Sequence, residues 1–124
     1  MLKIKRAYEE KSESDGKRIY VDRIWPRGLS KEEAAIDEWL KDIAPSDELH
    51  KWFGHEKDKF AEFRKRYIKE LSTPGRLEQL NRIAAMAREN NVTLVYSARD
   101  TEHNNAVVLA ELVRKLMKER ITVI

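Results

Sequence analysis

The residues best suited to chemistry fall into two short arginine-bearing segments, residues 21–28 (VDRIWPRG) and 94–100 (LVYSARD). Each begins as an apolar, strand-like run and ends in polar residues. If both runs are parallel strands of one sheet, their carboxyl ends meet at one edge, where α/β proteins usually bind ligands. Arginine recognises phosphate and carboxylate groups through paired N–H donors. The two segments therefore predict a site for a small anionic molecule at that edge.

The second segment leads directly into the start of a helix, residues 99–105 (RDTEHNN). The first amides of a helix lack partners and carry partial positive charge, which favours an anion. A purely structural interpretation makes Asp100 or Thr101 the N-cap of this helix. The concurrence of Arg99, His103 and two asparagines in one turn favours a binding site instead. The predicted ligand-binding residues are Arg23, Trp25, Arg27, Arg99, Asn104 and Asn105.

If the protein is an enzyme, His103 is the predicted general acid or base, because an imidazole titrates near neutral pH. Asp22 or Asp100 would orient it, and the reaction would be hydrolysis or group transfer. A structural alternative exists for Asp22, since a carboxylate within an apolar strand must be paired if it is buried. Its candidate partners are Arg23, Arg99 or a backbone amide. Whether the chain is catalytic stays open at this point.

The usual active-site motifs are missing from the sequence. It contains no glycine-rich phosphate loop, no dinucleotide fingerprint and no Gly-x-Ser-x-Gly nucleophile turn. The three histidines lack the spacing of metal ligands, although Asp100, Glu102 and His103 could hold an ion loosely. The chain has no cysteine and therefore no thiol chemistry. We expect neither a metal nor a cofactor.

Length and composition predict one α/β domain spanning residues 1–124, with a charged exterior. Charged residues make up 38% of the chain, but 25 basic and 22 acidic residues leave a net charge of only +3. Nucleic-acid backbones require a clustered basic surface, so this balance supports such a partner only weakly. No apolar run approaches the roughly 18 residues of a membrane span. We expect a cytoplasmic protein with no membrane partner, and the oligomeric state stays open.

The hydrophobic pattern predicts alternating strands and helices. Strands are expected at residues 2–7, 18–25, 92–96 and 121–124, and helices at residues 30–41, 47–53, 57–71, 73–89 and 101–120. The run at 92–96 is apolar on both faces, as in a parallel strand covered on both sides. The predicted fold is α/β, with a small single-layer, largely parallel sheet of three to four strands and helices on both faces. The strand order and the direction of the first strand stay open.

Residues 52–55 (WFGH) place two aromatic side chains and a histidine at a helix end that Gly54 closes. His50, two residues before Trp52 on a short charged helix, is expected at the surface. Two interpretations of residues 52–55 compete: a lid over a pocket, or ordinary packing. Packing is the narrowly favoured interpretation.

Several motifs in the same order resemble the YeaO-like branch of the domain-of-unknown-function family 488. They are VDRIWPRG at 21–28, WLKDIAPS at 39–46, KWFGH at 51–55 and ARDTEHN at 98–104, followed by AVVL at 106–109. The resemblance covers almost the whole chain and implies a small cytosolic α/β protein without an established activity. Other branches carry a cysteine at the position of Tyr96 and Cys-His-Arg in place of Asn104-Asn105-Ala106. Thiol or metal chemistry of those branches therefore does not transfer to this chain.

Two further hypotheses belong to other functional classes. A nucleic-acid-binding module would use Arg23, Arg27 and the basic residues at positions 3, 5 and 6, with Trp25 or Trp52 stacking on bases. A protein-interaction or purely structural domain would instead expose an apolar patch of Trp39, Trp52 and Phe53.

Overall fold

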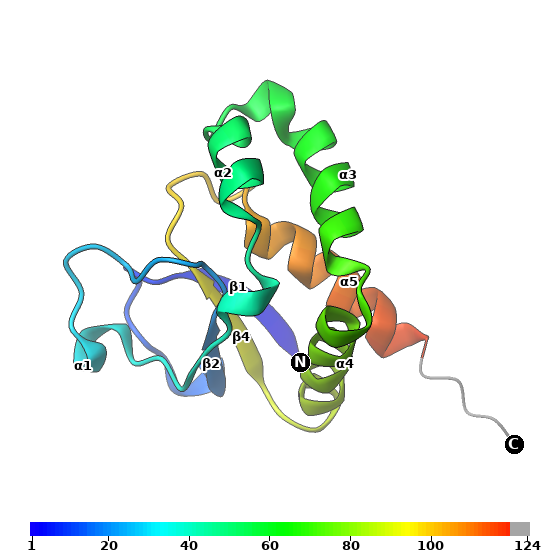
Figure 1. Ribbon diagram of the computed structural model, residues 1–124. Helices are drawn as coiled ribbons and strands as arrows, with labels where there is room; N and C mark the ends of the chain where they lie inside the picture. The colour runs from blue at the N-terminus through cyan, green and yellow to red at the C-terminus, as the bar shows by residue number, and fades with distance from the viewer. Residues whose placement is uncertain (120–124) are drawn as a thin grey trace, which may run out of the picture.

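The computed structural model describes residues 1–119 of the chain (Figure 1). The strands are β1 (Leu2–Arg6), β2 (Lys17–Tyr20), β3 (Glu38–Trp39) and β4 (Val92–Tyr96). The helices are α1 (Lys31–Ala34), α2 (Asp47–Phe53), α3 (Phe60–Leu71), α4 (Pro74–Glu89) and α5 (Asn105–Lys118). Short 3-10 turns cover Glu13–Asp15, Lys41–Ile43 and Lys57–Lys59. Among these 119 residues, no helix has both the length and the apolar character needed to cross a membrane.

The strands form one parallel sheet in the order β1-β4-β2-β3. Ile4 of β1 and Ile19 of β2 both lie opposite Leu94 of β4, so the most apolar strand is flanked by two others. All five residues of β4 are buried. The predicted α/β class with a largely parallel sheet is confirmed, and β1 runs parallel to its neighbour. The carboxyl ends of β2 and β4 therefore lie at the same edge.

The pleat of the strands sends alternate side chains into two layers. Leu94 belongs to the larger core, which is completed by apolar residues of helices α2 to α5. Val95 belongs to a smaller cluster with Ala7 and Tyr20, covered by Leu29, Ile36 and Trp39. Figure 1 shows the longer helices on one side of the sheet and the short helix α1 on the other. The second face of the sheet is therefore covered mainly by the loops on either side of α1.

Local start and stop signals account for the helices that match their predicted ranges. Ser46 caps α2 through its hydroxyl, which accepts from the amide of Leu49, and Gly54 ends the helix at φ 54°. Pro74 occupies the first position of α4, where its missing N–H costs nothing. Residues 57–71 begin as a 3-10 turn and continue as α3.

The predicted strand at residues 18–25 is wrong beyond Tyr20. The Val21 amide still donates to the carbonyl of Val95, but strand pairing then stops. The amide of Ser97, which follows β4, donates to the carboxylate of Asp22 instead of to a backbone carbonyl. A side chain thus takes over the bond that a longer strand would have made, and residues 22–25 form a loop.

The predicted helix at residues 30–41 is also wrong beyond its first turn. The capping box of Ser30 and Glu33 is present, but the chain leaves the helix at Ala35, whose φ is 49°. The guanidinium of Arg18 ends the helix there, because it donates hydrogen bonds to the carbonyls of Ala34 and Ala35. Those carbonyls would otherwise bond to amides further along a helix. Residues 38–39 instead form β3 beside β2.

The last helix begins later than predicted. Asn104, and neither Asp100 nor Thr101, is the N-cap of α5, and its Oδ1 accepts from the amide of Val107. The Asp100 carboxylate forms a separate turn, because it accepts from the amides of Glu102 and His103. Within the described residues the helix ends at Lys118. The predicted strand at residues 121–124 lies outside them.

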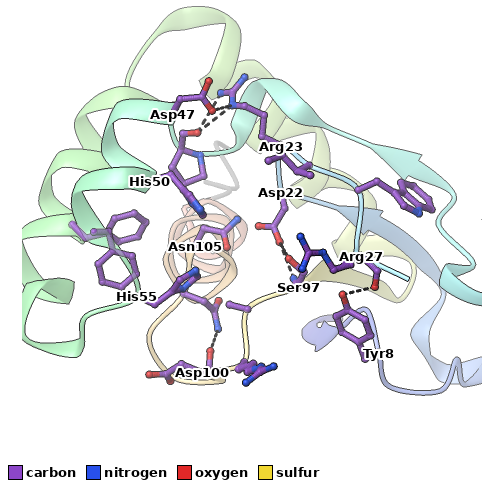
Figure 2. A pocket seen from close by; sticks show the side chains of 18 residues that line it. Tyr8, Asp22, Arg23, Arg27, Asp47, His50, His55, Ser97, Asp100 and Asn105 are labelled. Carbon is purple, nitrogen blue, oxygen red and sulfur yellow. Dashed lines mark hydrogen bonds and ion pairs between the residues drawn. The ribbon is translucent and has the colours of Figure 1, made fainter. Parts of the chain in front are cut away.

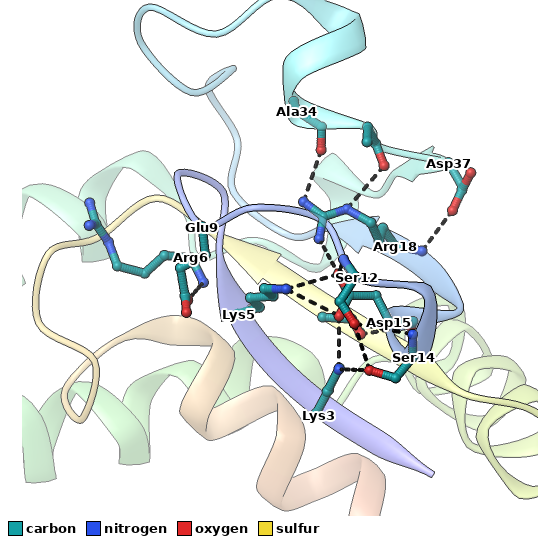
Figure 3. Close-up of polar contacts among 12 residues, drawn as sticks. Lys3, Lys5, Arg6, Glu9, Ser12, Ser14, Asp15, Arg18, Ala34 and Asp37 are labelled. Carbon is teal, nitrogen blue, oxygen red and sulfur yellow. Dashed lines mark hydrogen bonds and ion pairs between the residues drawn. The ribbon is translucent and has the colours of Figure 1, made fainter.

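A buried ionic network holds the second face of the sheet together (Figure 3). Arg18 and Asp15 are fully buried and form an ion pair of 2.7 Å between Nη1 and Oδ2. Lys3 and Lys5 of β1 reach the same carboxylate at 2.8 Å and 3.2 Å. Thr93 of β4 donates to the Asp15 carbonyl at 2.7 Å. The Asp15 carboxylate thereby ties β1 and β2 to the turn before β2, and the Asp15 backbone carbonyl ties β4 to the same turn.

Burial alone raises the pKa of the Asp15 carboxyl, but hydrogen bonds from Lys3, the Ser12 amide, Lys5 and Arg18 outweigh it. The pKa therefore lies well below its usual value. A carboxyl whose pKa is lower in the folded than in the unfolded state stabilises the fold above about pH 4. That contribution is lost as the pH falls.

We predict that Asp15 stays ionised in the folded protein at pH 3, where an unperturbed aspartate of pKa about 3.9 is mostly protonated. The measurement is an NMR titration of the Asp15 carboxyl carbon, with the urea-unfolded chain as control. The unfolded chain should titrate near pH 4. Coincident titration curves for the two states would contradict the role given to the network.

Gly16 adjoins this network in a conformation that only glycine adopts without strain. Its φ is +62°, and a Cβ built there lies 2.0 Å from the carbonyl oxygen of Asn91. We predict that Gly16→Ala lowers the free energy of unfolding by about 2–5 kcal/mol, through overpacking and backbone strain. Gly75→Ala is the matched control, because nothing lies within 4 Å of a Cβ at that helical position. Urea denaturation of both variants should show a loss only for Gly16→Ala.

Candidate anion-binding site

A cavity of about 650 Å³ opens at the carboxyl ends of β2 and β4 (Figure 2). Its walls come from the loops that follow these strands, from α2 and the turn after it, and from the first turn of α5. Most predicted site residues line it: Asp22, Arg23, Trp25, Arg27, Arg99, Asp100, Asn104 and Asn105. His103 is not among the lining residues.

Asp22 joins the two loops at the base of the cavity. Its Oδ2 accepts from the backbone amide and from the hydroxyl of Ser97, both at 2.7 Å. A backbone amide was one of the partners expected for this carboxylate. Ser97 directly follows β4, so the pair fixes the end of one strand to the loop of the other.

Arg23 ties the same loop to α2. Its guanidinium donates to the carbonyl of Pro45 at 3.3 Å and 3.4 Å and lies 3.7 Å from the Asp47 carboxylate. Figure 2 shows Arg23 and Asp47 together at the rim of the cavity. The donors of this arginine are thus largely engaged within the protein.

Arg27 and Arg99 differ from Arg23 in this respect. Both side chains are exposed and line the cavity. Across residues 1–119, neither guanidinium has a hydrogen-bond acceptor or an ion-pair partner. The loop that carries Arg27 is held from outside, because the hydroxyl of Tyr8 donates to the Arg27 carbonyl at 2.9 Å. Of the carboxylates in the cavity wall, those of Asp22 and Asp100 accept hydrogen bonds, and that of Asp47 is exposed, 3.7 Å from Arg23.

Trp25 contributes to the wall but has a structural partner. Its indole N–H donates to the carbonyl of Leu29 at 2.7 Å. Its ring packs edge-on against Trp39 at 5.3 Å and against Tyr20 at 5.9 Å. The tryptophan therefore anchors the arginine loop on the second face of the sheet.

The first turn of α5 faces the same cavity. Asn105 is 8% exposed, and its Nδ2 donates to the carbonyl of Val21 at 3.0 Å. Asn104 caps the helix and donates from its Nδ2 to the carbonyl of Asp100 at 2.8 Å. The first amides of the helix lack intrahelical partners and add partial positive charge at this wall.

His103 and Asp100 form a pair beside the cavity. The His103 Nδ1 lies 3.0 Å from Asp100 Oδ2, and the imidazole meets the ring of Phe60 edge-on at 5.2 Å. The hydrogen bond from the Glu102 amide is the largest cause that lowers the pKa of the Asp100 carboxyl, and the His103 amide and ring add to it. Asp100 orients His103, while the imidazole packs toward α3.

Two other histidines line the cavity, His50 and His55. Their rings lie 5.6 Å apart at right angles. His50 is exposed, as predicted, and its spacing of three from Phe53 puts both residues on neighbouring parts of one helix face. His55 has a φ of 59°, a conformation that costs a residue with a side chain about 1–2 kcal/mol. No simple sequence pattern reveals that conformation.

The part of the chain that the structure describes holds no cluster of three histidine, aspartate or glutamate side chains arranged as metal ligands.

The family model described as "Inactive DUF488-N3 subclade" matches residues 1–122. The chain is 44% identical over 115 residues to the uncharacterized protein YeaO of Escherichia coli, covering 93% of this chain and 98% of YeaO. It is 38% identical over 111 residues to the uncharacterized proteins Mb3100c of Mycobacterium bovis and Rv3073c of Mycobacterium tuberculosis. These matches cover 90% of this chain and 92% of each relative. No solved structure matches the chain significantly.

The chain therefore belongs to the DUF488 family, as a YeaO-like member of the DUF488-N3 subclade. The family resemblance predicted from the sequence motifs is confirmed.

We predict that Asp22→Ala lowers the free energy of unfolding by about 1–3 kcal/mol, because it leaves the Ser97 amide without its acceptor. Ser97→Ala is the matched control. It removes the hydroxyl bond but keeps the amide bond, and should cost about 1 kcal/mol or less. Urea denaturation of both variants measures the difference. Equal losses would show that the bond to the amide does not hold the two loops together.

Proposed function

We propose that this DUF488-N3 protein binds a small anionic molecule in the cavity, through a phosphate or carboxylate group held by Arg27 and Arg99. One observation carries the proposal: two exposed guanidinium groups that have no acceptor within residues 1–119 line the cavity, whose Asp22 and Asp100 carboxylates are already engaged. Guanidinium groups bind such oxyanions through paired, charge-assisted hydrogen bonds. A bound oxyanion replaces water as the acceptor of these donors.

The first turn of α5 supports the same kind of ligand. Helix N-termini bind anions through free amides and the positive end of the helix dipole. Asn105 is held by its bond to Val21, so its position beside these amides is fixed. The proposed site therefore combines flexible arginine donors with a rigid backbone wall.

The proposal is for binding without catalysis. The Nδ1 atom of His103 is paired with the Asp100 carboxylate, and the imidazole ring packs against Phe60. His103 does not line the cavity. The description of the matching family as inactive supports the same conclusion. Hydrolysis or group transfer through His103 therefore does not form part of this proposal.

The nucleic-acid hypothesis has less support from the contacts. Lys3 and Lys5 are committed to the buried Asp15 carboxylate. Arg6 donates to the carbonyls of Ala98 and Ser97. Because these basic side chains serve the fold, they do not provide the clustered free charge that phosphate backbones need. We propose a cytoplasmic location, since a chain without cysteine needs no oxidising compartment.

The interaction hypothesis rested on Trp39, Trp52 and Phe53. Phe53 is buried, and the ring of Trp52 is covered by the guanidinium of Arg66 at 4.1 Å. The ammonium of Lys41 lies 4.0 Å from the Trp39 ring centroid. These contacts favour packing roles for the three residues.

We predict that Arg99→Ala weakens the binding of small phosphate or carboxylate ligands by at least about tenfold, as expected for losing a charge-assisted hydrogen bond of about 1.5–3 kcal/mol. The measurement is isothermal titration calorimetry at fixed ionic strength, with thermal melts to show that the variant folds. Lys118→Ala is the control, because it removes one positive charge at the far end of α5. Unchanged affinity in Arg99→Ala would refute the assignment. Binding seen only with oligonucleotides, and lost steeply with salt, would favour the nucleic-acid alternative.

A further inference from the structure

The cavity is much larger than the anion that the arginines would hold. Its volume of about 650 Å³ lies within the range of about 300–1,000 Å³ typical of pockets for drug-sized organic molecules. Inorganic phosphate or acetate would leave most of this space to water. The anionic group is therefore expected to be one part of a larger ligand.

The wall that faces the arginine loop is built from rings. His50, Phe53, His55 and Phe63 all line the cavity. The ring of His55 is 5.6 Å from that of His50 and 6.2 Å from that of Phe53. Figure 2 shows His50 and His55 across the cavity from Arg27 and Ser97, with Asn105 between the two walls. The two histidine rings thus lie across the cavity from Arg27.

The backbone around His55 favours a ligand-binding role for this ring. His55 follows Gly54 directly, and both residues have positive φ, 59° and 54°. Glycine adopts this conformation freely, whereas a residue with a side chain adopts it at a cost. Such strained residues gather at ligand sites. Here the strained residue contributes a ring to the cavity wall.

We propose that the ligand is an organic anion with an aromatic or heteroaromatic ring. Its phosphate or carboxylate group binds Arg27 and Arg99, and its ring packs against His50 and His55. This inference rests on the proposed function and adds the chemical class of the ligand. A nucleotide and a simple aryl phosphate share this chemistry.

The test compares four probes by isothermal titration calorimetry of the full chain at one ionic strength: inorganic phosphate, ribose 5-phosphate, phenyl phosphate and adenosine monophosphate. We expect at least one ring-bearing phosphate to bind about fivefold or more tightly than both phosphates without an aromatic ring, a gain typical of stacking on aromatic side chains. Preference for adenosine monophosphate over phenyl phosphate would identify a nucleotide-like ligand, and the reverse would identify a smaller aryl anion.

His55→Gly removes the ring and relieves the positive φ, so the variant should melt no lower than the parent. In this variant we expect the advantage of the ring-bearing probes to fall to within about twofold, with the affinity for inorganic phosphate unchanged. Ala35→Gly is the matched control, because it relieves a φ of 49° outside the cavity and should leave all affinities unchanged.

The outcomes separate this inference from the function on which it rests. Arg99-dependent phosphate binding without a ring advantage, or a ring advantage that persists in His55→Gly, would overturn the inference and leave the proposed function standing. Failure of all four phosphates to bind, together with failure of their carboxylate counterparts (acetate and benzoate), would overturn both.

Discussion

The arrangement of the whole sheet depends on one buried ion pair, that between Asp15 and Arg18. Both side chains are fully buried, so neither charge can be satisfied by water. Removing one partner of such a pair leaves an uncompensated buried charge, which typically costs about 3–5 kcal/mol. Arg18 also ends α1 by binding the carbonyls of Ala34 and Ala35. The same pair therefore decides where β2 begins and how the chain returns to form β3.

The position of the cavity follows from this constraint. All four strands run parallel, so their carboxyl ends lie at one edge of the sheet. The Asp22–Ser97 contact then joins the loops after β2 and β4 at their bases. Arg27 and Arg99 lie further along these loops, beyond the point where they are joined. The backbone of Arg27 is held by Tyr8, while both guanidinium groups stay exposed.

Sequence reasoning predicted the parts of the fold that depend on local signals. The apolar run of β4, the cap and stop of α2 and the proline at the start of α4 each act within a few residues. The wrong boundaries arose where a distant side chain competes with the backbone. Asp22 ends β2 by binding Ser97, and Arg18 ends α1 by binding its carbonyls. Neither event can be predicted from propensity or periodicity, because each depends on tertiary contact.

The candidate site was likewise predicted only where local sequence signals determine it. Its arginines were found because they follow apolar strands, and strand ends have a known place in α/β folds. His50 and His55 were left out of the predicted site, although a lid over a pocket was one interpretation of residues 52–55, because they come from a helix and a turn that pack over the strand ends only in three dimensions. His103 was favoured because it follows β4 and carries an imidazole, the side chain best suited to acid–base chemistry near neutral pH, yet its ring is directed by Asp100 toward Phe60. Chain position located the wall of the cavity but not the direction of each side chain.

The charges around the cavity bear on how it would select a ligand. Arg23, Arg27 and Arg99 are matched in number by Asp22, Asp47 and Asp100, and the whole chain carries a net charge of only +3. Long-range attraction of an anion is therefore weak, because steering requires a surface dominated by one sign of charge. Affinity must come from short-range, directional donors and from contact with the ring-bearing wall. A site of this kind distinguishes anions by shape and by the spacing of their oxygen atoms, more than by total charge.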